Sequence, residues 1–171
     1  MIPAKADHPV RFFRAIPKKI RPAMHIVLVE PEIPHNTGAA GRLALATGST
    51  LHLVKPLGFS LDEKSVRRAG LDYWKEVDLK VWETFEEFLA AHPGARLWLL
   101  STKAKKSLWD TSFSEGDFLV FGPETRGLPE SWLDQRALRI PMRKDSTRSL
   151  NLATAVAIVL YEAQRQVGTL T

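Results

Sequence analysis

The sequence contains no cysteine among its 171 residues. Disulfide bonds, thiolate metal sites and cysteine nucleophiles are therefore excluded, which is typical of a cytosolic protein. The sequence also has no apolar run of the ~18 residues that a membrane-spanning helix requires; its longest candidate, Ala155–Leu160, reads as the core of a helix. We therefore expect a cytoplasmic protein with no membrane partner.

Several catalytic signatures are missing as well. The five histidines have neither the spacing of metal ligands nor an HExxH pattern, so we expect no metal site. There is no GxxxxGK[ST] phosphate loop, no GxGxxG after the first predicted strand and no GxSxG nucleophile elbow. The chemistry of this chain is therefore expected to come from other loops.

The positive charge is concentrated at the N-terminus. The formal net charge is +5, and residues 1–22 alone carry six basic side chains against one acidic side chain, whereas residues 23–171 are balanced. A basic arm of this kind attracts phosphate without reading sequence, although a solvated leader would look the same. We predict a basic extension over residues 1–22 and a single domain over residues 23–171.

Short apolar runs alternate with amphipathic segments along the rest of the chain. This alternation predicts an α/β fold with a mostly parallel sheet. The expected strands are residues 25–29, 50–55, 79–82, 96–101, 118–121 and 137–140, and the expected helices are residues 37–47, a short one within 60–70, 85–92 after a capping box, and a long one from Leu150. The last helix is apolar nearly all round from Leu152 to Leu160, so it must be buried in the core or between subunits.

Two loops in the last third of the chain are the most informative. Each follows a buried-looking strand and leads toward a helix: Gly122–Gly127 comes after Phe118–Phe121, and a polar loop to Arg148 comes after Ile140-Pro141-Met142. Ligands of open α/β sheets bind beyond the carboxyl ends of the strands. We therefore predict one composite pocket at these loops, in which a side chain at Gly122 would take the space of the ligand.

Two further segments carry polar residues beside predicted helix ends. Asn36 or Thr37 could simply cap the first long helix, and Arg42, one turn further on, could be a solvated charge. Ser149 is placed to cap the last helix, with Asn151 in its first turn. Capping explains Ser149 but leaves Asn151 without a reason.

Taken together, three segments resemble the motifs of the SPOUT 2′-O-ribose RNA methyltransferases. They are Asn36-Thr37-Gly38 with Arg42, Phe121–Pro129, and Arg148–Leu152. The compact form of the chain and the segment Arg67–Tyr73 are similar to the members that methylate the wobble nucleotide of tRNA, which is cytidine or modified uridine at position 34. The resemblance runs from His25 to Gly168; the loop Arg143–Arg148 is slightly longer than usual in this family.

The resemblance implies a fold, a cofactor and partners. The fold would be a single α/β domain whose C-terminal segment forms a deep trefoil knot, in a homodimer that binds tRNA. S-adenosyl-L-methionine would lie in the knot crevice and leave as S-adenosyl-L-homocysteine. Its expected binding residues are Leu100, Ser101, Thr102, Phe121, Gly122, Pro123, Glu124, Gly127, Ile140, Pro141, Met142, Ser149 and Leu150.

The resemblance also implies roles for Arg42, Asn36, Glu124, Ser149 and Asn151. Arg42 would assist or perform deprotonation of the ribose hydroxyl, Asn36 would position the RNA, and the other three would order the site. An arginine is ordinarily always protonated, so Arg42 would either be a base in an unusual site or bind phosphate and the nascent alkoxide. Candidate tRNA contacts are Arg67, Arg68, Lys103, Lys105, Lys106, Arg126 and Arg148.

Other functions remain open at this point. The chain could methylate another tRNA position or rRNA, or it could be a non-catalytic RNA-binding module with a vestigial pocket, against which the intact Arg42, Glu124, Ser149 and Asn151 speak. It could also be an α/β enzyme that uses a different adenine-containing cofactor. Thermal stabilisation by S-adenosylhomocysteine, compared with NAD and ATP, would separate these alternatives.

Overall fold

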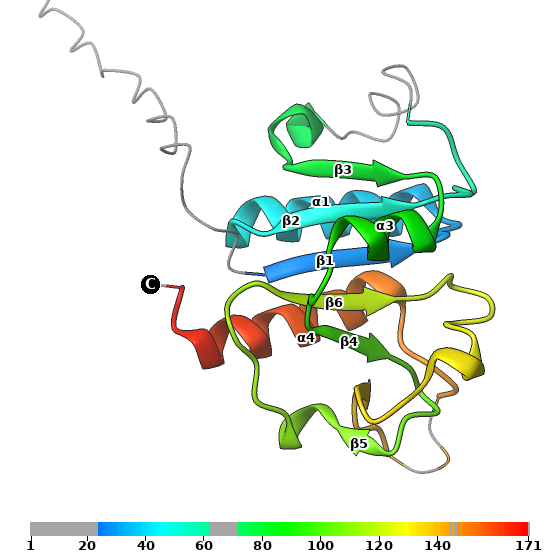
Figure 1. Ribbon diagram of the computed structural model, residues 1–171, viewed down its shortest axis with the longest axis vertical. Helices are drawn as coiled ribbons and strands as arrows, with labels where there is room; N and C mark the ends of the chain where they lie inside the picture. Colours follow the sequence, from blue (N-terminus) through cyan, green and yellow to red (C-terminus); the bar gives the residue numbers. More distant parts are fainter. Residues whose placement is uncertain (1–23, 62–71, 144, 146, 171) are drawn as a thin grey trace, which may run out of the picture.

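The computed structural model describes residues 24–61, 72–143, 145 and 147–170. Three α-helices and seven strands are found there (Figure 1). The strands are β1 (Met24–Val29), β2 (Thr50–Val54), β3 (Leu79–Trp82), β4 (Leu97–Leu100), β5 (Lys106–Ser107), β6 (Asp117–Phe121) and β7 (Ala137–Arg139). The helices are α1 (Pro34–Thr47), α3 (Phe85–Ala91) and α4 (Leu152–Val167), with short 3-10 turns η1 (Asp72–Glu76), η2 (Leu108–Asp110) and η3 (Glu130–Trp132).

The strands form one sheet in the order β3-β2-β1-β6-β4-β7-β5, and every neighbouring pair is parallel. This confirms the predicted α/β class with a single domain. In the centre, Ile26 of β1 lies opposite Leu51 of β2 on one side and Leu119 of β6 on the other. Because β1 and β6 are neighbours, the loops that follow them lie side by side although they are about ninety residues apart.

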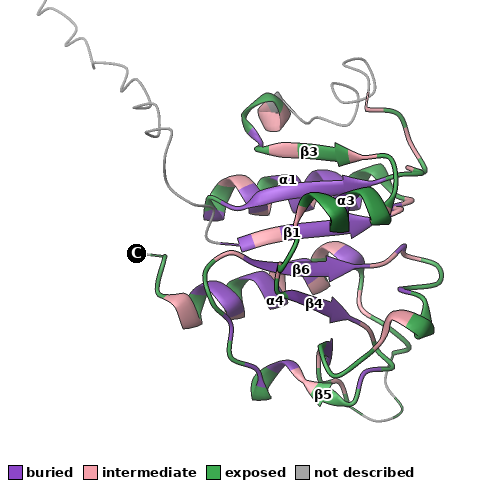
Figure 2. Ribbon diagram, viewed as in Figure 1, coloured by how far each residue is buried: buried purple, intermediate pink, exposed green. Residues whose placement is uncertain are grey.

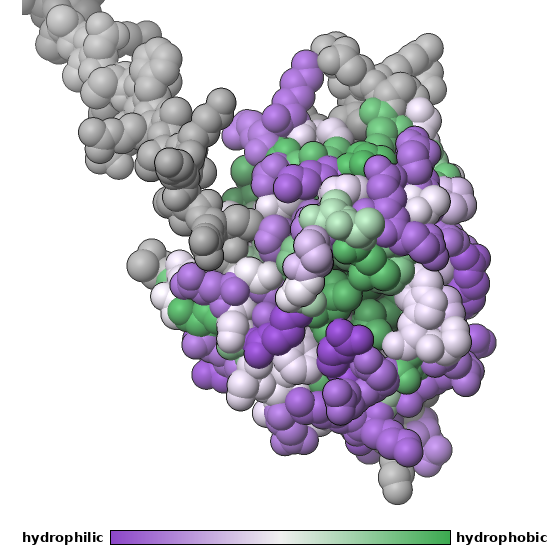
Figure 3. All heavy atoms as spheres, in the orientation of Figure 1, coloured by the Kyte–Doolittle hydropathy of each residue, from purple (hydrophilic) through white to green (hydrophobic). Residues whose placement is uncertain are grey.

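The core has two halves, one on each face of the sheet. Successive side chains of a strand point to opposite faces, so Ile26 and Leu28 of β1 join the core beneath α1 and α4, while Val27 joins the core beneath α3. Figures 1 and 2 show α3 on one side of buried strands and α4 on the other. In Figure 3, hydrophobic residues gather in the middle of the α3 side, within a surround of hydrophilic residues.

The first long helix begins earlier than predicted. Helix α1 starts at Pro34 rather than Thr37, because proline suits the first helical position. Its N-cap, Ile33, makes no side-chain capping bond. Its end agrees with the prediction, since Gly48 closes it in the left-handed region with φ of 64°.

The start of the last helix corrects the prediction. Helix α4 begins at Leu152, and its N-cap is Asn151, whose side chain accepts a hydrogen bond from the backbone N–H of Thr154. Ser149 therefore does not cap it. The burial expected from Leu152 to Leu160 holds in part: Val156, Val159 and Leu160 are buried, whereas Ile158 is half-buried and Thr154 is exposed in the single chain.

The remaining predicted elements agree within a few residues. Thr84 caps α3 as expected, accepting from the backbone N–H of Glu87. The two-residue strand β5 was not predicted. Most of the range 60–70, in which a short helix was expected, lies outside the described residues. So do the greater part of the motif Arg67–Tyr73, with the candidate tRNA contacts Arg67 and Arg68, and the basic extension 1–22. No helix of the described part is long and apolar enough to cross a membrane.

Candidate functional site

A cavity of about 430 Å³ opens at the carboxyl ends of β4, β6 and β7. This is the composite pocket predicted from the two loops. Its lining includes all of the predicted cofactor-binding residues except Pro141, namely Leu100, Ser101, Thr102, Phe121, Gly122, Pro123, Glu124, Gly127, Ile140, Met142, Ser149 and Leu150. Parallel strands end together at one edge of the sheet, which is why segments distant in sequence meet here.

Four of the five predicted catalytic residues also line this cavity. These are Asn36, Glu124, Ser149 and Asn151, and they come from three separate segments of the chain. Arg42 does not line it. In an α-helix, six residues of separation place Arg42 ~9 Å further along α1 than Asn36 and on a different side of the helix, where its side chain is exposed.

Glu124 binds the start of α1. Its carboxylate accepts hydrogen bonds from the backbone N–H groups of Glu32 at 2.8 Å and Ile33 at 3.2 Å, and from Asn36 Nδ2 at 3.0 Å. A carboxylate is stabilised by the positive end of a helix dipole. Because Ile33 offers α1 no side-chain cap, Glu124 supplies this function from another loop.

Asn36 links Glu124 to the last helix. Its Oδ1 accepts a hydrogen bond of 2.9 Å from Asn151 Nδ2, while its Nδ2 donates to Glu124. The Asn36 side chain is only 4% exposed, so each end of its amide already has a protein partner. One donor hydrogen and one lone pair remain for a ligand. Asn36 therefore joins all three predicted motifs, as a link more than as an open RNA contact.

The loop 122–127 is folded tightly on itself. Gly127 has φ of 70°, and its N–H donates to the carbonyl oxygen of Pro123 at 2.9 Å. A Cβ atom added at Gly122 would lie 2.4 Å from the carbonyl carbon of Gly127 and from the backbone nitrogen of Leu128. Glycine is thus needed at position 122 for the loop itself. This corrects the expectation that a side chain there would act by filling the ligand's space.

Two acidic residues of the β1–α1 loop contact the loop 122–127 in return. The carboxylate of Glu32 accepts from the backbone N–H of Thr125 at 2.9 Å and from its hydroxyl at 2.8 Å. Glu30, which has φ of 48°, forms an ion pair with Arg126. Neither residue was predicted from the sequence, where their only signal was two carboxylates in a proline-rich loop after a buried strand.

Arg42 is held beside the turn η1. Its guanidinium carbon lies 4.6 Å from the centroid of the Tyr73 ring, and the Tyr73 hydroxyl donates to the carbonyl oxygen of Gly38 at 2.7 Å. The neighbouring Trp74 ring packs so closely on α1 that a Cβ atom at Gly41 would lie 2.6 Å from it. The turn η1 therefore packs on α1 and places an aromatic ring beside the exposed Arg42.

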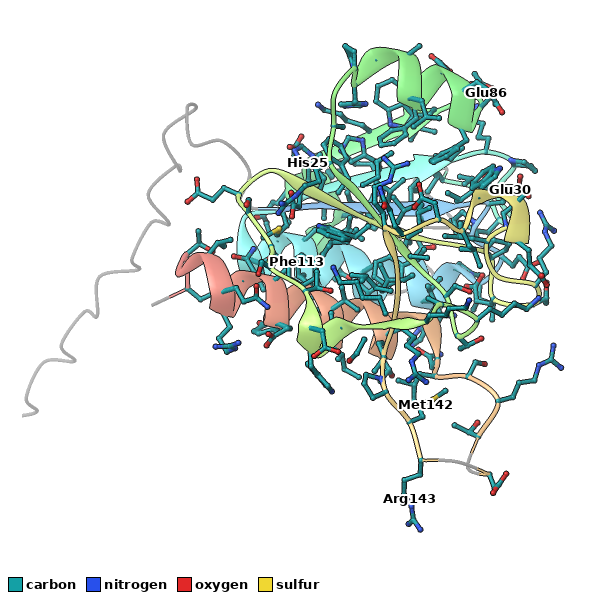
Figure 4. The ribbon with its side chains drawn as sticks, turned by 60° about the horizontal axis from the view of Figure 1, so that its bottom comes forward. His25, Glu30, Glu86, Phe113, Met142 and Arg143 are labelled. Atoms are coloured by element: carbon teal, nitrogen blue, oxygen red, sulfur yellow. The ribbon has the colours of Figure 1, made fainter. Side chains whose placement is uncertain are left out.

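A histidine–aromatic cluster lies at the other end of β1, and Figure 4 shows His25 and Glu30 at opposite ends of this strand. His25 Nδ1 is 3.0 Å from His52 Nε2, and Trp82 Nε1 donates to His52 Nδ1 at 3.1 Å. Burial, with the nearby Lys80 and His92, lowers the pKa of His25 to about 4. Burial, with the nearby His25 and His92, lowers the pKa of His52 to about 3. Both rings are neutral near pH 7.

The cavity has the size and lining of a small-molecule site. Ligand pockets commonly measure about 300–1,000 Å³ and combine apolar walls with a few polar groups, as the Leu100, Ile140 and Leu150 side chains and the loop backbones do here. Among the described residues there is no group of three or more histidine, aspartate or glutamate side chains that could hold a metal ion.

Met142 and Arg143 lie on the projecting loop between β7 and α4 (Figure 4).

Two relatives of known function are similar to this chain over most of its length. One relative is the tRNA (cytidine(34)-2′-O)-methyltransferase of Methylovorus glucosotrophus, 51% identical over 82% of this chain and 94% of its own length. The Escherichia coli K12 enzyme of the same name is 48% identical over 85% of this chain and 94% of its own length.

Solved structures show the same fold. One, described as giving structural insights into the 2-OH methylation of C/U34 on tRNA, is 51% identical, with a TM-score of 0.78 over 84% of this chain and 95% of its own. The SpoU methyltransferase AviRb of Streptomyces viridochromogenes, solved with the cofactor AdoMet, is 27% identical, with a TM-score of 0.72 over 86% of this chain and 59% of its own. The model of the SpoU rRNA Methylase family matches residues 23–161. The chain belongs to the SpoU methylase family.

Proposed function

We propose that this protein transfers the methyl group of S-adenosyl-L-methionine to the 2′-hydroxyl of the wobble nucleotide, cytidine or modified uridine 34, of tRNA. One observation carries the proposal. About half of the aligned residues are identical to those of tRNA (cytidine(34)-2′-O)-methyltransferases, and the alignments cover more than nine-tenths of the length of those enzymes. The cavity supports it, because the three motif segments that define the resemblance meet there. A cytoplasmic location follows from this role.

The residues of the cavity divide between the two ligands. The donor supplies an electrophilic methyl group, so the protein has only to align the acceptor hydroxyl and help remove its proton. Leu100, Ile140 and Leu150 would enclose the adenine ring, and the loop 122–127 would present backbone groups to the donor. Glu124 and Asn151 hold Asn36 in place through the hydrogen bonds described above.

Arg42 would act from a second copy of the chain. It lies outside its own cavity, exposed on α1, and α1 packs beside α4, whose Tyr161 is also exposed. A homodimer that buries these two helices would bring the Arg42 of one chain towards the cavity of the other. The deep knot implied by the resemblance would shape that cavity. A monomer mass at micromolar concentration in solution would contradict this arrangement; a dimer mass is expected.

Basic side chains at the rim of the cavity would contact the RNA. Arg126, Arg148 and Lys103 line it. Arg126 is held by Glu30 and Lys103 by Glu130, through exposed ion pairs that contribute little to stability. Such pairs can exchange for phosphate at small cost, so these residues fit the role of positioning the nucleotide.

A second candidate substrate is rRNA, because the family model carries that description. The experiment that separates the candidates uses methyl-labelled donor with total tRNA and, in parallel, total rRNA. We expect label on tRNA alone, at the ribose of nucleotide 34. Label on rRNA alone, or on a base, would exclude the proposal.

A further inference from the structure

The loop after β1 and the loop after β6 exchange their carboxylates. Glu124 of the second loop accepts from the backbone N–H groups of Glu32 and Ile33 in the first. Glu32 of the first loop accepts from the backbone N–H and the hydroxyl of Thr125 in the second. Each loop therefore supplies the acceptor that the other loop's backbone requires, and neither arrangement is complete alone.

The exchange joins two different parts of the proposed site. The loop 122–127 lines the cavity on the donor side, whereas the β1–α1 loop leads directly into Asn36 and, nearly two turns later, Arg42. From Asn36 the hydrogen bonds continue to Asn151, at the start of α4. A shift in either loop would break charge-assisted hydrogen bonds, which are about twice as strong as neutral ones.

We propose that Glu32 is a positioning residue through which the methyl donor and the RNA strengthen each other's binding. Ordering of the loop 122–127 by the donor fixes Thr125, and thereby Glu32 and the start of α1, before the RNA arrives. The second ligand then meets a segment that is already ordered. This inference rests on the proposed function, since it takes tRNA as the second ligand.

The backbone just after β1 supports this role of Glu32. Glu30, two residues before Glu32, adopts φ of 48°, a conformation that side-chain-bearing residues rarely take. Such backbone positions persist only where their surroundings hold them; here the backbone N–H of Glu30 donates to the carbonyl oxygen of Val54 at 2.8 Å, and its carboxylate meets Arg126 of the loop 122–127. The segment 30–33 is therefore held on one side by Val54 and Gly58 and on the other by the loop 122–127.

The test measures how S-adenosylhomocysteine changes the affinity for a tRNA transcript with cytidine at position 34. For the unaltered protein we expect tRNA to bind about 5-fold or more tightly when S-adenosylhomocysteine is saturating, with the same factor for the reverse order of addition. In Glu32→Ala this factor should fall to about 1. In Glu32→Gln, which keeps an acceptor for Thr125, most of the factor should remain.

A merely structural role of Glu32 would weaken tRNA binding equally with and without S-adenosylhomocysteine. The factor between these two affinities would then stay unchanged, so this factor is the decisive readout. Glu83→Gln is the matched control, because Glu83 is an exposed carboxylate paired with Lys55 at the end of β3, outside the cavity. If Glu32→Ala does not fold, Thr125→Val, which removes only the hydroxyl donor, should still reduce the factor.

The outcomes separate this inference from the proposed function. The inference fails if the unaltered protein binds both ligands but S-adenosylhomocysteine leaves its tRNA affinity unchanged. It also fails if Glu32→Ala and Thr125→Val keep the full increase in tRNA affinity. In either case Glu32 does not couple the two ligands, while the proposed function stands. If the unaltered protein binds neither ligand, both proposals fail.

Discussion

The two ends of β1 use buried polar groups in different ways. Beyond its carboxyl end, charged groups at the edge of a cavity are held by backbone N–H groups and amides from two loops, as around Glu124. Near its start, His25 and His52 are packed among aromatic rings and kept neutral by burial. This chain thus keeps a charged side chain at the edge of the cavity and neutral rings in the packed cluster.

This division gives substitutions at the two ends opposite signatures. Changes at the cavity end should reduce methyl transfer more strongly than they reduce stability. Changes in the histidine–aromatic cluster should reduce stability and alter its pH dependence, with little effect on turnover at neutral pH.

The largest expected effect is on Arg42. Arg42→Ala should lower methyl transfer to tRNA by roughly two or more orders of magnitude, as for loss of a group that acts in the transition state. Affinity for S-adenosylhomocysteine and dimer mass should stay near those of the unaltered protein. Arg42→Lys should restore little, because lysine is a point charge on a flexible stem. Near-normal single-turnover methylation by Arg42→Ala would mean that Arg42 is only a solvated charge.

Glu124→Gln should come next, with a loss of about 100-fold in turnover, the scale expected when catalytic groups shift by ~1 Å. The substitution removes the charge and replaces one of the two carboxylate oxygens by an NH₂ group. These oxygens accept from the backbone N–H groups of Glu32 and Ile33 and from Asn36 Nδ2, so at least one of the three donors loses its acceptor. Glu83→Gln is a suitable control, because Glu83 is an exposed carboxylate whose pair with Lys55 lies outside the cavity and contributes little. Equal activity of the two variants would contradict the role given to Glu124.

The pH dependence of unfolding tests the other end of β1. The folded-state pKa values of His25 and His52, about 4 and 3, lie below the unfolded value of 6.5. The unfolded chain therefore binds more protons below pH 6.5, so stability is fully present above that pH and is lost as the pH falls towards 4 and then 3. Urea unfolding at pH 7.5 and pH 5 should show this decrease.

His52→Phe should weaken that decrease while lowering stability at pH 7.5 by about 1–3 kcal/mol, because Trp82 Nε1 loses its buried acceptor. Methyl transfer at pH 7.5 and at a temperature well below unfolding should be unchanged. A pH dependence as steep as that of the unaltered protein would show that His52 is not the titrating group.

The smallest expected effect concerns the support of Arg42. Tyr73→Leu removes the ring beside the guanidinium and should lower turnover by about 2- to 5-fold, the value of an exposed cation–π contact. Tyr73→Phe keeps the ring and should restore most of that loss. Equal turnover of the two variants would assign Tyr73 to packing alone.

Most strands could be predicted because they are short apolar runs, and the buried centre of β6 is an example. The two-residue strand β5 could not, since Lys106 and Ser107 carry no apolar pattern and pair only because β7 lies beside them. The start of α4 was misplaced because Ser149 and Asn151 are both good capping residues. In the structure the side chain of Asn151 is also bound by Asn36, more than one hundred residues away, a contact that no local pattern shows.

The location of the candidate site could be predicted from the sequence, but only part of its hydrogen bonds could. The positions of the cavity residues followed from strand ends and from the family motifs. The contacts of Glu32 and Glu30 did not, because each joins loops about ninety residues apart and no local pattern marks them. The exclusion of Arg42 from the cavity of its own chain likewise became visible only when α1 was placed in the fold.

The most direct test of the account is the position of the transferred methyl group. The protein is incubated with methyl-labelled S-adenosyl-L-methionine and a tRNA transcript, and the label is located by nuclease digestion and mass spectrometry. The account predicts a 2′-O-methylated ribose at nucleotide 34 and no label in a transcript whose nucleotide 34 is already 2′-O-methylated. Label at any other nucleotide, or on a base, would contradict it.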